Sequence, residues 1–153
     1  MKLNEILTPA RVAVDVLSSS KKSALEQLAR GASQDVPELT PAQAFDSLVE
    51  RERLGSTALG QGIAIPHGRI AHLKSMVGAF MRVSDGVEFD SIDGEPVDLF
   101  FALFVPADTN EVHLEALSQL AALFSDIELV AQLRKEPSVD KIHQLLVSEP
   151  KLK

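Results

Sequence analysis

His67 is the residue of this chain whose surroundings are best suited to chemistry. It follows a short apolar run, residues 63–65, which predicts a brief buried strand. Pro66 ends the pairing of that strand because it has no N–H, and it keeps Ile65 in an extended conformation. Gly68 has no side chain, so a partner can approach the imidazole closely. We therefore expect a rigidly presented histidine at the end of a strand.

Basic residues are concentrated around this histidine, although the chain as a whole is acidic. The net charge is −7, from 15 basic and 22 acidic residues, which argues against general nucleic-acid binding. Residues 51–74 nevertheless contain four basic residues and one acidic residue. The basic ones are Arg51, Arg53, Arg69 and Lys74, and the acidic one is Glu52. This basic island suggests an anionic ligand near His67; the alternative is a few solvated surface arginines.

A second histidine, His113, lies in the first turn of a predicted helix. Helical spacing places it in line with three apolar residues, namely Leu117, Leu120 and Phe124. Two interpretations stay open: a half-buried core histidine, or a second imidazole that points toward the site of His67. His72 and His143 have no nearby glycine frame or carboxylate partner, so we interpret them as surface or boundary residues.

Three other uses of these histidines fit the sequence less well. The chain has no cysteine and no His-x-x-x-His or His-Glu-x-x-His spacing, which argues against a metal site. Gly60 and Gly62 precede a strand instead of opening a helix, and no Walker-type Gly-Lys-Ser or Gly-Lys-Thr occurs, so a nucleotide site is not predicted. Ser56 lacks the Gly-x-Ser-x-Gly elbow of many hydrolases.

Attack on phosphorus by the imidazole itself is the chemistry that remains. Neutral imidazole predominates at pH 7 when its pKa is near about 6.5, so it can act as a nucleophile without a separate strong base. Phosphoryl transfer requires mainly positioning and cationic stabilisation of the transferred oxygens, and no metal is obligatory. Residues 51–67 together with His113 contain all of the residue types that this chemistry requires.

The elements that must position these residues are interleaved helices and strands. Strands are predicted at residues 11–17, 63–65, 76–83 and 97–105. Helices are predicted at residues 21–30, from a capping box at 40–43 to just before Gly55, at 109–124, at 126–135 and after Ser138. Between them lie a glycine-rich loop at 55–62 and turns at 84–86 and 93–94. This order predicts an α/β (α+β) fold in which one mixed sheet is flanked by helices.

Several ends of these helices carry recognisable signals. Ser20 is a predicted N-cap, Gly31 a predicted stop, and Asp108 with Glu111 a predicted capping pair.

Length and composition indicate one globular domain over residues 1–153. Apolar residues make up 45% of the chain, but the longest apolar run, residues 99–105, is far too short to span a bilayer. The N-terminal residues are not followed by a signal-type apolar segment. The absence of cysteine excludes disulfides and thiol catalysis. We therefore expect a cytoplasmic protein without membrane insertion.

Four segments of the chain resemble the signature of one family. They read RERLGST at 51–57, GIAIPHG at 62–68, FDSIDGEPVDL at 89–99 and HL at 113–114. This pattern closely resembles the enzyme IIA domains of the phosphoenolpyruvate-dependent phosphotransferase system (PTS), fructose/mannitol type. The resemblance covers nearly the whole chain and is greatest to the nitrogen-regulatory branch.

The resemblance implies a mixed sheet flanked by helices and a role as a phosphohistidine carrier more than a turnover enzyme. It implies that His67 is the phosphorylated residue and that Arg51 and His113 line the phosphohistidine site. The donor would be an HPr-like carrier protein (NPr), itself supplied from phosphoenolpyruvate by an enzyme I. No cofactor is implied. Regulated targets would include potassium-transport or sensor proteins.

Two alternatives remain open at this stage. One is a IIA component that passes the phosphoryl group to a IIB domain for sugar transport. The other is a non-catalytic interaction module whose histidine no longer turns over.

Overall fold

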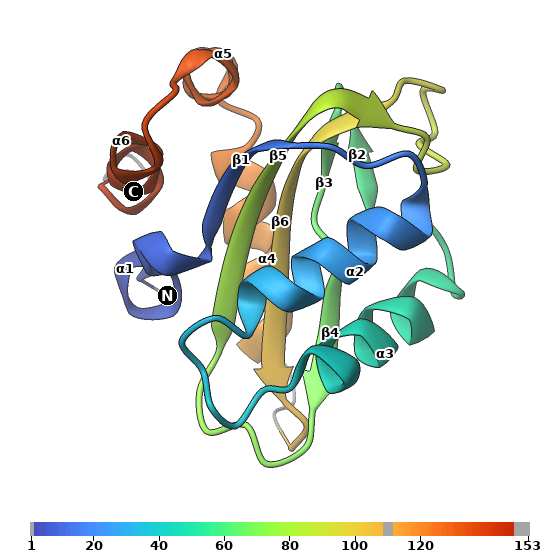
Figure 1. Cartoon of the computed structure of the whole chain (residues 1–153), viewed down its shortest axis with the longest axis vertical. Coiled ribbons are helices and arrows are strands. Elements are labelled where there is room, and N and C mark those ends of the chain that lie inside the picture. Colours follow the sequence, from blue (N-terminus) through green and yellow to red (C-terminus); the bar gives the residue numbers. More distant parts are fainter. Residues whose placement is uncertain (1, 109–111, 149–153) are drawn as a thin grey trace.

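The structure is a computed structural model that describes residues 2–108 and 112–148, and for residues 112 and 113 the backbone alone. Within these residues a six-stranded mixed sheet forms the centre of the molecule (Figure 1). The strands are β1 (Val12–Val16), β2 (Ala58–Gly60), β3 (Ile63–Ala64), β4 (His67–Ile70), β5 (Val77–Val87) and β6 (Val97–Pro106). Their order is β1-β5-β6-β3-β2, and β4 also pairs with β6. The sheet is mixed because β6 is antiparallel to β5 but parallel to β3 and β4.

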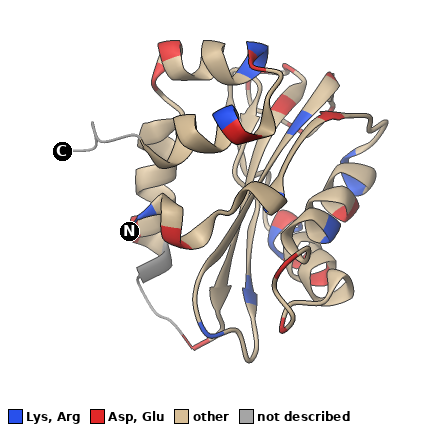
Figure 2. Cartoon of the chain, turned by 60° about the vertical axis from the view of Figure 1, so that its left-hand side comes forward, with Lys and Arg blue, Asp and Glu red and all other residues tan. Residues whose placement is uncertain are grey.

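Helices cover both faces of this sheet. On one face lie α2 (Lys21–Ala32) and α3 (Pro41–Glu52), which run side by side (Figure 1). The remaining helices are α1 (Leu3–Ile6), the short 3₁₀ helix η1 (Pro9–Arg11), α4 (Val112–Leu123), α5 (Ile127–Lys135) and α6 (Val139–Val147). Figure 2 shows the sheet nearly edge-on, with α2 and α3 on one side and the other α-helices opposite. The predicted fold class is therefore confirmed.

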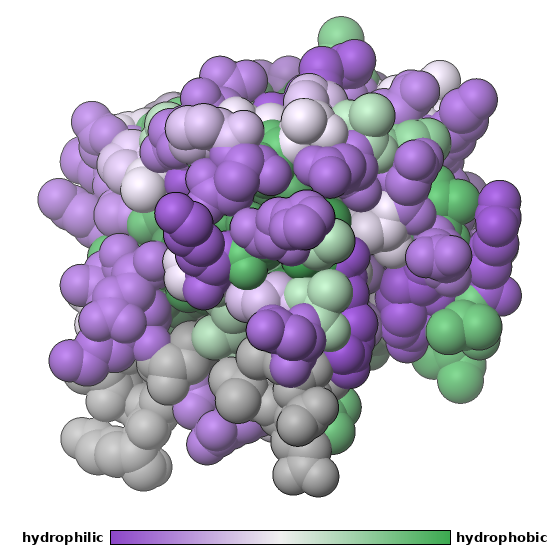
Figure 3. Space-filling view, turned by 90° about the horizontal axis from the view of Figure 1, so that it is seen from below, coloured by the Kyte–Doolittle hydropathy of each residue, from purple (hydrophilic) through white to green (hydrophobic). Residues whose placement is uncertain are grey.

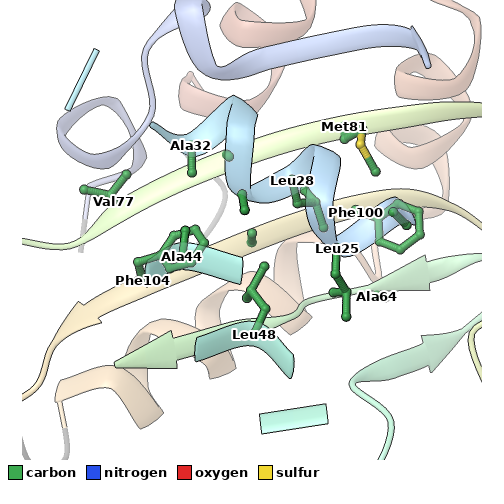
Figure 4. Packing of buried hydrophobic residues seen from close by; sticks show 14 of the residues in the cluster. Leu25, Leu28, Ala32, Ala44, Leu48, Ala64, Val77, Met81, Phe100 and Phe104 are labelled. Atoms are coloured by element: carbon green, nitrogen blue, oxygen red, sulfur yellow. The ribbon is translucent and has the colours of Figure 1, made fainter. Parts of the chain in front are cut away.

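Two apolar clusters hold these layers together, one on each face of the sheet. In the first, Leu25, Leu28 and Leu48 from α2 and α3 pack against Phe100 and Phe104 of β6 (Figure 4). Strand β6 is buried on both faces at every position except Asp98, which is half-buried. This confirms the interpretation of its apolar sequence as a central strand.

Most of the predicted helix starts are confirmed by the caps observed. The side chain of Ser20 accepts a hydrogen bond from Ser23 N, and Thr40 with Gln43 forms a complete capping box. Asp126 and Ser138 cap α5 and α6 in the same way.

Three local predictions were wrong or incomplete. Gly31 does not end its helix: α2 continues for one residue beyond it, which buries Ala32 completely. Residues 84–86 are not a turn between strands, because β5 continues through them with a register shift until Val87 pairs with Val97. The loop at 55–62 contains the short strand β2. The capping pair predicted for Asp108 and Glu111 includes a residue, Glu111, that lies outside the described residues.

A buried arginine ties the N-terminal segment to the rest of the molecule. Arg11 is 6% exposed and donates to the backbone carbonyls of Gly78 at 2.9 Å and Ile6 at 2.8 Å. Its remaining guanidinium nitrogen pairs with Asp35, which also accepts from Thr8 Oγ1 at 2.8 Å. Burial would raise the pKa of Asp35, but the hydrogen bonds from Thr8 and Arg11, together with the charge of Arg11, lower this pKa below its ordinary value of 3.8.

The surface is largely hydrophilic where it is seen from below, with apolar residues in recesses between polar side chains and at a protrusion on the right (Figure 3). In the described part of the chain, no helix has both the length and the apolar character needed to cross a membrane.

Candidate functional site

His67 begins a strand instead of standing at the end of one. Strand β3 ends before Pro66 as predicted, but the chain resumes parallel pairing with β6 directly at His67, which lies opposite Leu103. Ile65 and Pro66 separate the two strands, and the carbonyl of Pro66 accepts a hydrogen bond from Leu103 N at 2.9 Å. His67 is consequently held against the central strand β6, and the residue is half-buried.

The two ring nitrogens of His67 face partners of opposite hydrogen-bonding character. Nδ1 lies 3.1 Å from the carbonyl oxygen of Ile65, which can only accept, so Nδ1 carries the proton and donates it. Nε2 lies 3.2 Å from Nε of Arg51, which can only donate, so Nε2 is the acceptor. The arrangement selects the neutral tautomer whose lone pair is on Nε2, next to a permanent positive charge.

The approach of Arg51 depends on the absence of a side chain at Gly68. A Cβ atom at Gly68 would stand 2.7 Å from Cβ of Ser47 and 3.0 Å from its carbonyl carbon, so α3 can lie this close to β4 only because residue 68 is glycine. Arg51 is one turn beyond Ser47 on the same side of α3. We expected Gly68 to leave room for an external partner; instead the room is filled by α3, which brings Arg51 to His67.

The end of α3 is held by a second set of polar contacts. Arg51 Nη1 donates to the carbonyl of Gly55 at 2.9 Å. Glu52 is buried, accepts from the backbone N–H and the hydroxyl of Thr57, and forms an ion pair with Lys21 at 3.0 Å. Burial alone would lower the pKa of Lys21, but hydrogen bonds and charge interactions with Glu52 and Asp90 outweigh this and raise the pKa. Lys21 therefore stays charged and Glu52 serves the structure of this turn.

His67 and Arg51 open into a cavity of about 610 Å³. Its wall mixes apolar side chains with a few polar ones, as small-ligand and docking sites commonly do. The wall includes Ser47, Glu50, Leu54, Arg69, Val105, Leu114 and Leu117. Arg69 is two residues beyond His67 on the same face of β4, and its Nη1 donates to the carbonyl of Ala107 at 3.2 Å.

The basic island is only partly a feature of this cavity. Arg51 and Arg69 line it, whereas Arg53 and Lys74 do not. An acidic residue, Glu50, also lies in the wall, directly before the basic island of residues 51–74. The charge pattern of the sequence does not predict that Glu50 lines the cavity. The helical spacing of Ser47, Arg51 and Leu54 is the sequence feature that indicates which side of this segment faces the cavity.

His113 lies in the first turn of α4. α4 begins at Val112, and the side chain of His113 lies outside the described residues. Leu114 and Leu117 line the cavity of His67, so the first turns of α4 border it. The role of His113 stays a prediction.

The remaining histidines lie where boundary residues are expected. His72 is exposed, with a positive φ of 70°, and His143 is half-buried with Nε2 2.8 Å from the carbonyl oxygen of Leu7. The described residues hold no group of three or more histidine, cysteine, aspartate or glutamate side chains placed to bind a metal ion.

Fold and site together define an α/β protein that presents one imidazole, with its tautomer selected by two partners, beside an arginine in an open cavity. The chain belongs to the family described as "Phosphoenolpyruvate-dependent sugar phosphotransferase system, EIIA 2", whose model matches residues 5–149.

Known proteins similar to this chain agree with that membership. A nitrogen regulatory protein of Pseudomonas aeruginosa is 42% identical over 147 residues, which are 96% of each chain. The crystal structure of nitrogen regulatory protein IIA-Ntr from Neisseria meningitidis is 40% identical, with a TM-score of 0.86 over 94% of this chain and 98% of the other.

A more distant neighbour shares the fold alone. It is the mannitol enzyme IIA of Escherichia coli, solved in complex with phosphorylated enzyme IIB. It is 19% identical, with a TM-score of 0.77 over 93% of this chain and 97% of the other.

Proposed function

We propose that this protein is a phosphocarrier of a nitrogen-related PTS, which accepts a phosphoryl group on Nε2 of His67 and controls partner proteins through its phosphorylation state. The donor is an HPr-like carrier protein (NPr), and the exchange takes place in the cytoplasm. The observation that supports this best is the ring geometry of His67. Ile65 holds the proton on Nδ1, and Nε2 offers its lone pair beside Arg51 at the cavity.

The transfer step forms one N–P bond and breaks another. The lone pair of Nε2 attacks the phosphorus of the carrier's phosphohistidine, and the carrier's imidazole leaves with the electron pair of the old bond. If the donor ring is protonated on its other nitrogen, it leaves as neutral imidazole and no proton has to move. His67 then becomes a phosphoimidazolium whose Nδ1–H, hydrogen-bonded to the Ile65 carbonyl, carries the new positive charge.

Arg51 supplies the cationic stabilisation that this step requires. Its Nε donates to Nε2 before transfer; this hydrogen bond breaks as the lone pair of Nε2 attacks phosphorus, and the freed N–H donates to the arriving phosphoryl oxygens. His113, in the first turn of the helix that borders the cavity, is proposed as a second donor to the phosphoryl group.

The regulatory use follows from the charge that phosphorylation adds. A phosphoryl group brings about two negative charges to the cavity, whose rim includes the exposed Leu54 and Leu114. Partners that bind this apolar rim would have to desolvate the charged phosphoryl group, which weakens their binding. Partners with an arginine cluster would gain ion pairs with the phosphoryl oxygens. The nitrogen regulatory names of the relatives support regulation over sugar transport. The targets in this proposal are potassium-transport or sensor proteins.

Reconstitution with purified components tests this function. We expect incubation with phosphoenolpyruvate, enzyme I and an HPr-like carrier to place an acid-labile phosphoryl group on the parental protein and on His72→Ala, which changes an exposed histidine. His67→Ala should take up none. Label that persists in His67→Ala would refute the assignment. Efficient onward transfer to a sugar-specific IIB domain, with no effect on regulatory partners, would favour the transport role.

A further inference from the structure

A second open groove lies between α2 and α3, on the opposite side of α3 from the His67 cavity. It has a volume of about 510 Å³. Its walls include the apolar side chains of Leu25, Phe45 and Val49 and the buried carboxylate of Glu52. Phe45 and Val49 are only half-buried, and they pack against the apolar cluster on this face of the sheet. Val49 and Arg51 point to opposite sides of the buried face of α3, so the groove and the cavity are separate surfaces.

The rim of this groove carries two exposed cations. Lys22 lies in the first turn of α2 and Arg53 directly follows α3, and both line the groove. The described part of the chain places no acidic side chain within ion-pair distance of either one. Lys21 differs from them, because it is already neutralised by Glu52 and Asp90. The groove and its ion pairs therefore hold three positive charges (Lys21, Lys22 and Arg53) against two negative ones (Glu52 and Asp90), a net charge of +1, in a protein whose net charge is −7.

The helix dipole adds to this imbalance. The first turn of α2 contains two lysines and no acidic residue, although the N-terminus of a helix favours negative charge. The ion pairs with Glu52 and Asp90 explain why a lysine at position 21 is tolerated at the N-terminus of α2. Within the described part of the chain, no ion pair of this kind compensates Lys22. An external carboxylate placed near Lys22 would be stabilised by the lysine, by Arg53 and by the N-terminus of α2 together.

We propose that the α2–α3 groove is a docking site for an acidic amphipathic helix of a partner protein. The helix would lay an apolar stripe on Leu25, Phe45 and Val49 and direct flanking carboxylates at Lys22 and Arg53. α2 and α3 run antiparallel (Figure 1), and the open groove between them can accept a third helix. The net charge of −7 repels an acidic helix from the molecule as a whole, whereas Lys22 and Arg53 attract it to this groove.

Three synthetic peptides of about 18 residues, long enough to become helical on binding, provide the probes. One has a leucine stripe flanked by glutamates, the second the same stripe flanked by lysines, and the third the glutamates with serine in place of leucine. Titration into ¹⁵N-labelled protein should shift backbone signals of Leu25, Phe45 and Val49 with the first peptide only. Shifts confined to Gly68 and Leu103 would place binding at the His67 cavity and refute the proposal. Equal binding of the lysine peptide, or no binding of the first peptide, would also refute it.

Charge reversal at the rim identifies the contribution of the two cations. In Lys22→Glu/Arg53→Glu, two attractions become two repulsions, and the affinity for the glutamate–leucine peptide should fall about tenfold or more. The matched control Arg30→Glu/Lys74→Glu makes the same change of net charge at exposed positions outside the groove and should bind within about twofold of the parent. Equal weakening in both double variants would contradict the proposal.

Binding at the His67 cavity and self-association of the chain are each tested by one further control. His67→Ala should bind the peptide as the parent does, because the groove does not include His67. Signals of the groove that shift when the unliganded protein is merely concentrated would show that a second copy of the chain covers it, and would refute docking of a partner helix.

Discussion

Gly68→Ala is the substitution that tests most sharply how the fold builds the site. The new Cβ would stand 2.7 Å from Cβ of Ser47, whereas carbon atoms in favourable contact are about 3.5–4.0 Å apart. α3 must therefore move away from β4 by roughly 1 Å, since β4 is fixed by its pairing with β6. The distance between Arg51 Nε and His67 Nε2, now 3.2 Å, would grow to about 4 Å, which is too long for a hydrogen bond.

This displacement should affect both stability and phosphorylation. Overpacking of this kind costs about 1–3 kcal/mol in the free energy of unfolding, measured by urea denaturation. Misplacement of a stabilising group by about 1 Å should slow phosphorylation of His67 roughly ten- to a hundredfold in a timed assay with limiting carrier protein.

Two controls make the result interpretable. Gly31→Ala introduces a methyl group that meets nothing within 4 Å in a helix, so it should stabilise the protein by about 0.5–1 kcal/mol and leave the rate unchanged. Adding Gly68→Ala to Arg51→Ala should produce little further slowing, because the residue that the methyl group displaces is already absent. Parental stability and rate in Gly68→Ala would refute the link between this close packing and Arg51.

Three further substitutions test separate parts of the structure. Arg51→Lys keeps the charge but loses the planar fork and Nε, so phosphorylation should slow about tenfold, against about a hundredfold for Arg51→Ala; equal rates for both variants would contradict this. Asp35→Asn should cost about 1–2 kcal/mol of unfolding free energy at pH 7, because Arg11 loses its anionic partner. Folding lowers the pKa of Asp35, so the difference in unfolding free energy between the parent and Asp35→Asn should be complete well above pH 3.8 and disappear as the pH falls below it. A difference in unfolding free energy that persists in acid would contradict the ion pair as its cause. Gly62→Ala should destabilise the protein by more than about 1 kcal/mol in thermal unfolding, because φ is +82° and a Cβ would strike Arg134; parental stability would refute this.

The parts of the fold that could be predicted are those that local sequence determines. The caps at Ser20 and Thr40 are satisfied by residues three positions away, so their geometry does not depend on the rest of the chain. The apolar run of β6 indicates a central strand in any arrangement that buries both of its faces.

The errors arose where a distant element decides the outcome. Gly31 would end an isolated helix, but burial of Ala32 in the core extends α2 beyond it. Residues 84–86 read as a turn, but the length of β6 allows β5 to continue until Val87 pairs with Val97.

The sequence predicts which residues form the site better than it predicts how they contact one another. The frame of proline and glycine indicates His67, and the resemblance of residues 51–57 to a family signature indicates Arg51. That Arg51 donates to Nε2 depends on how closely α3 approaches β4, which is a tertiary contact that no local pattern encodes.

The central claim is that His67 carries the phosphoryl group on Nε2, and NMR of protein labelled with ¹⁵N in its histidines tests it most directly. Long-range ¹H–¹⁵N spectra before and after phosphorylation report which ring nitrogen carries a proton and which one bonds to phosphorus. We predict that Nδ1 of His67 is protonated in the free protein and that phosphorus couples to Nε2 alone after transfer. Phosphorus coupled to Nδ1 of His67, or to a nitrogen of another histidine, would contradict the account.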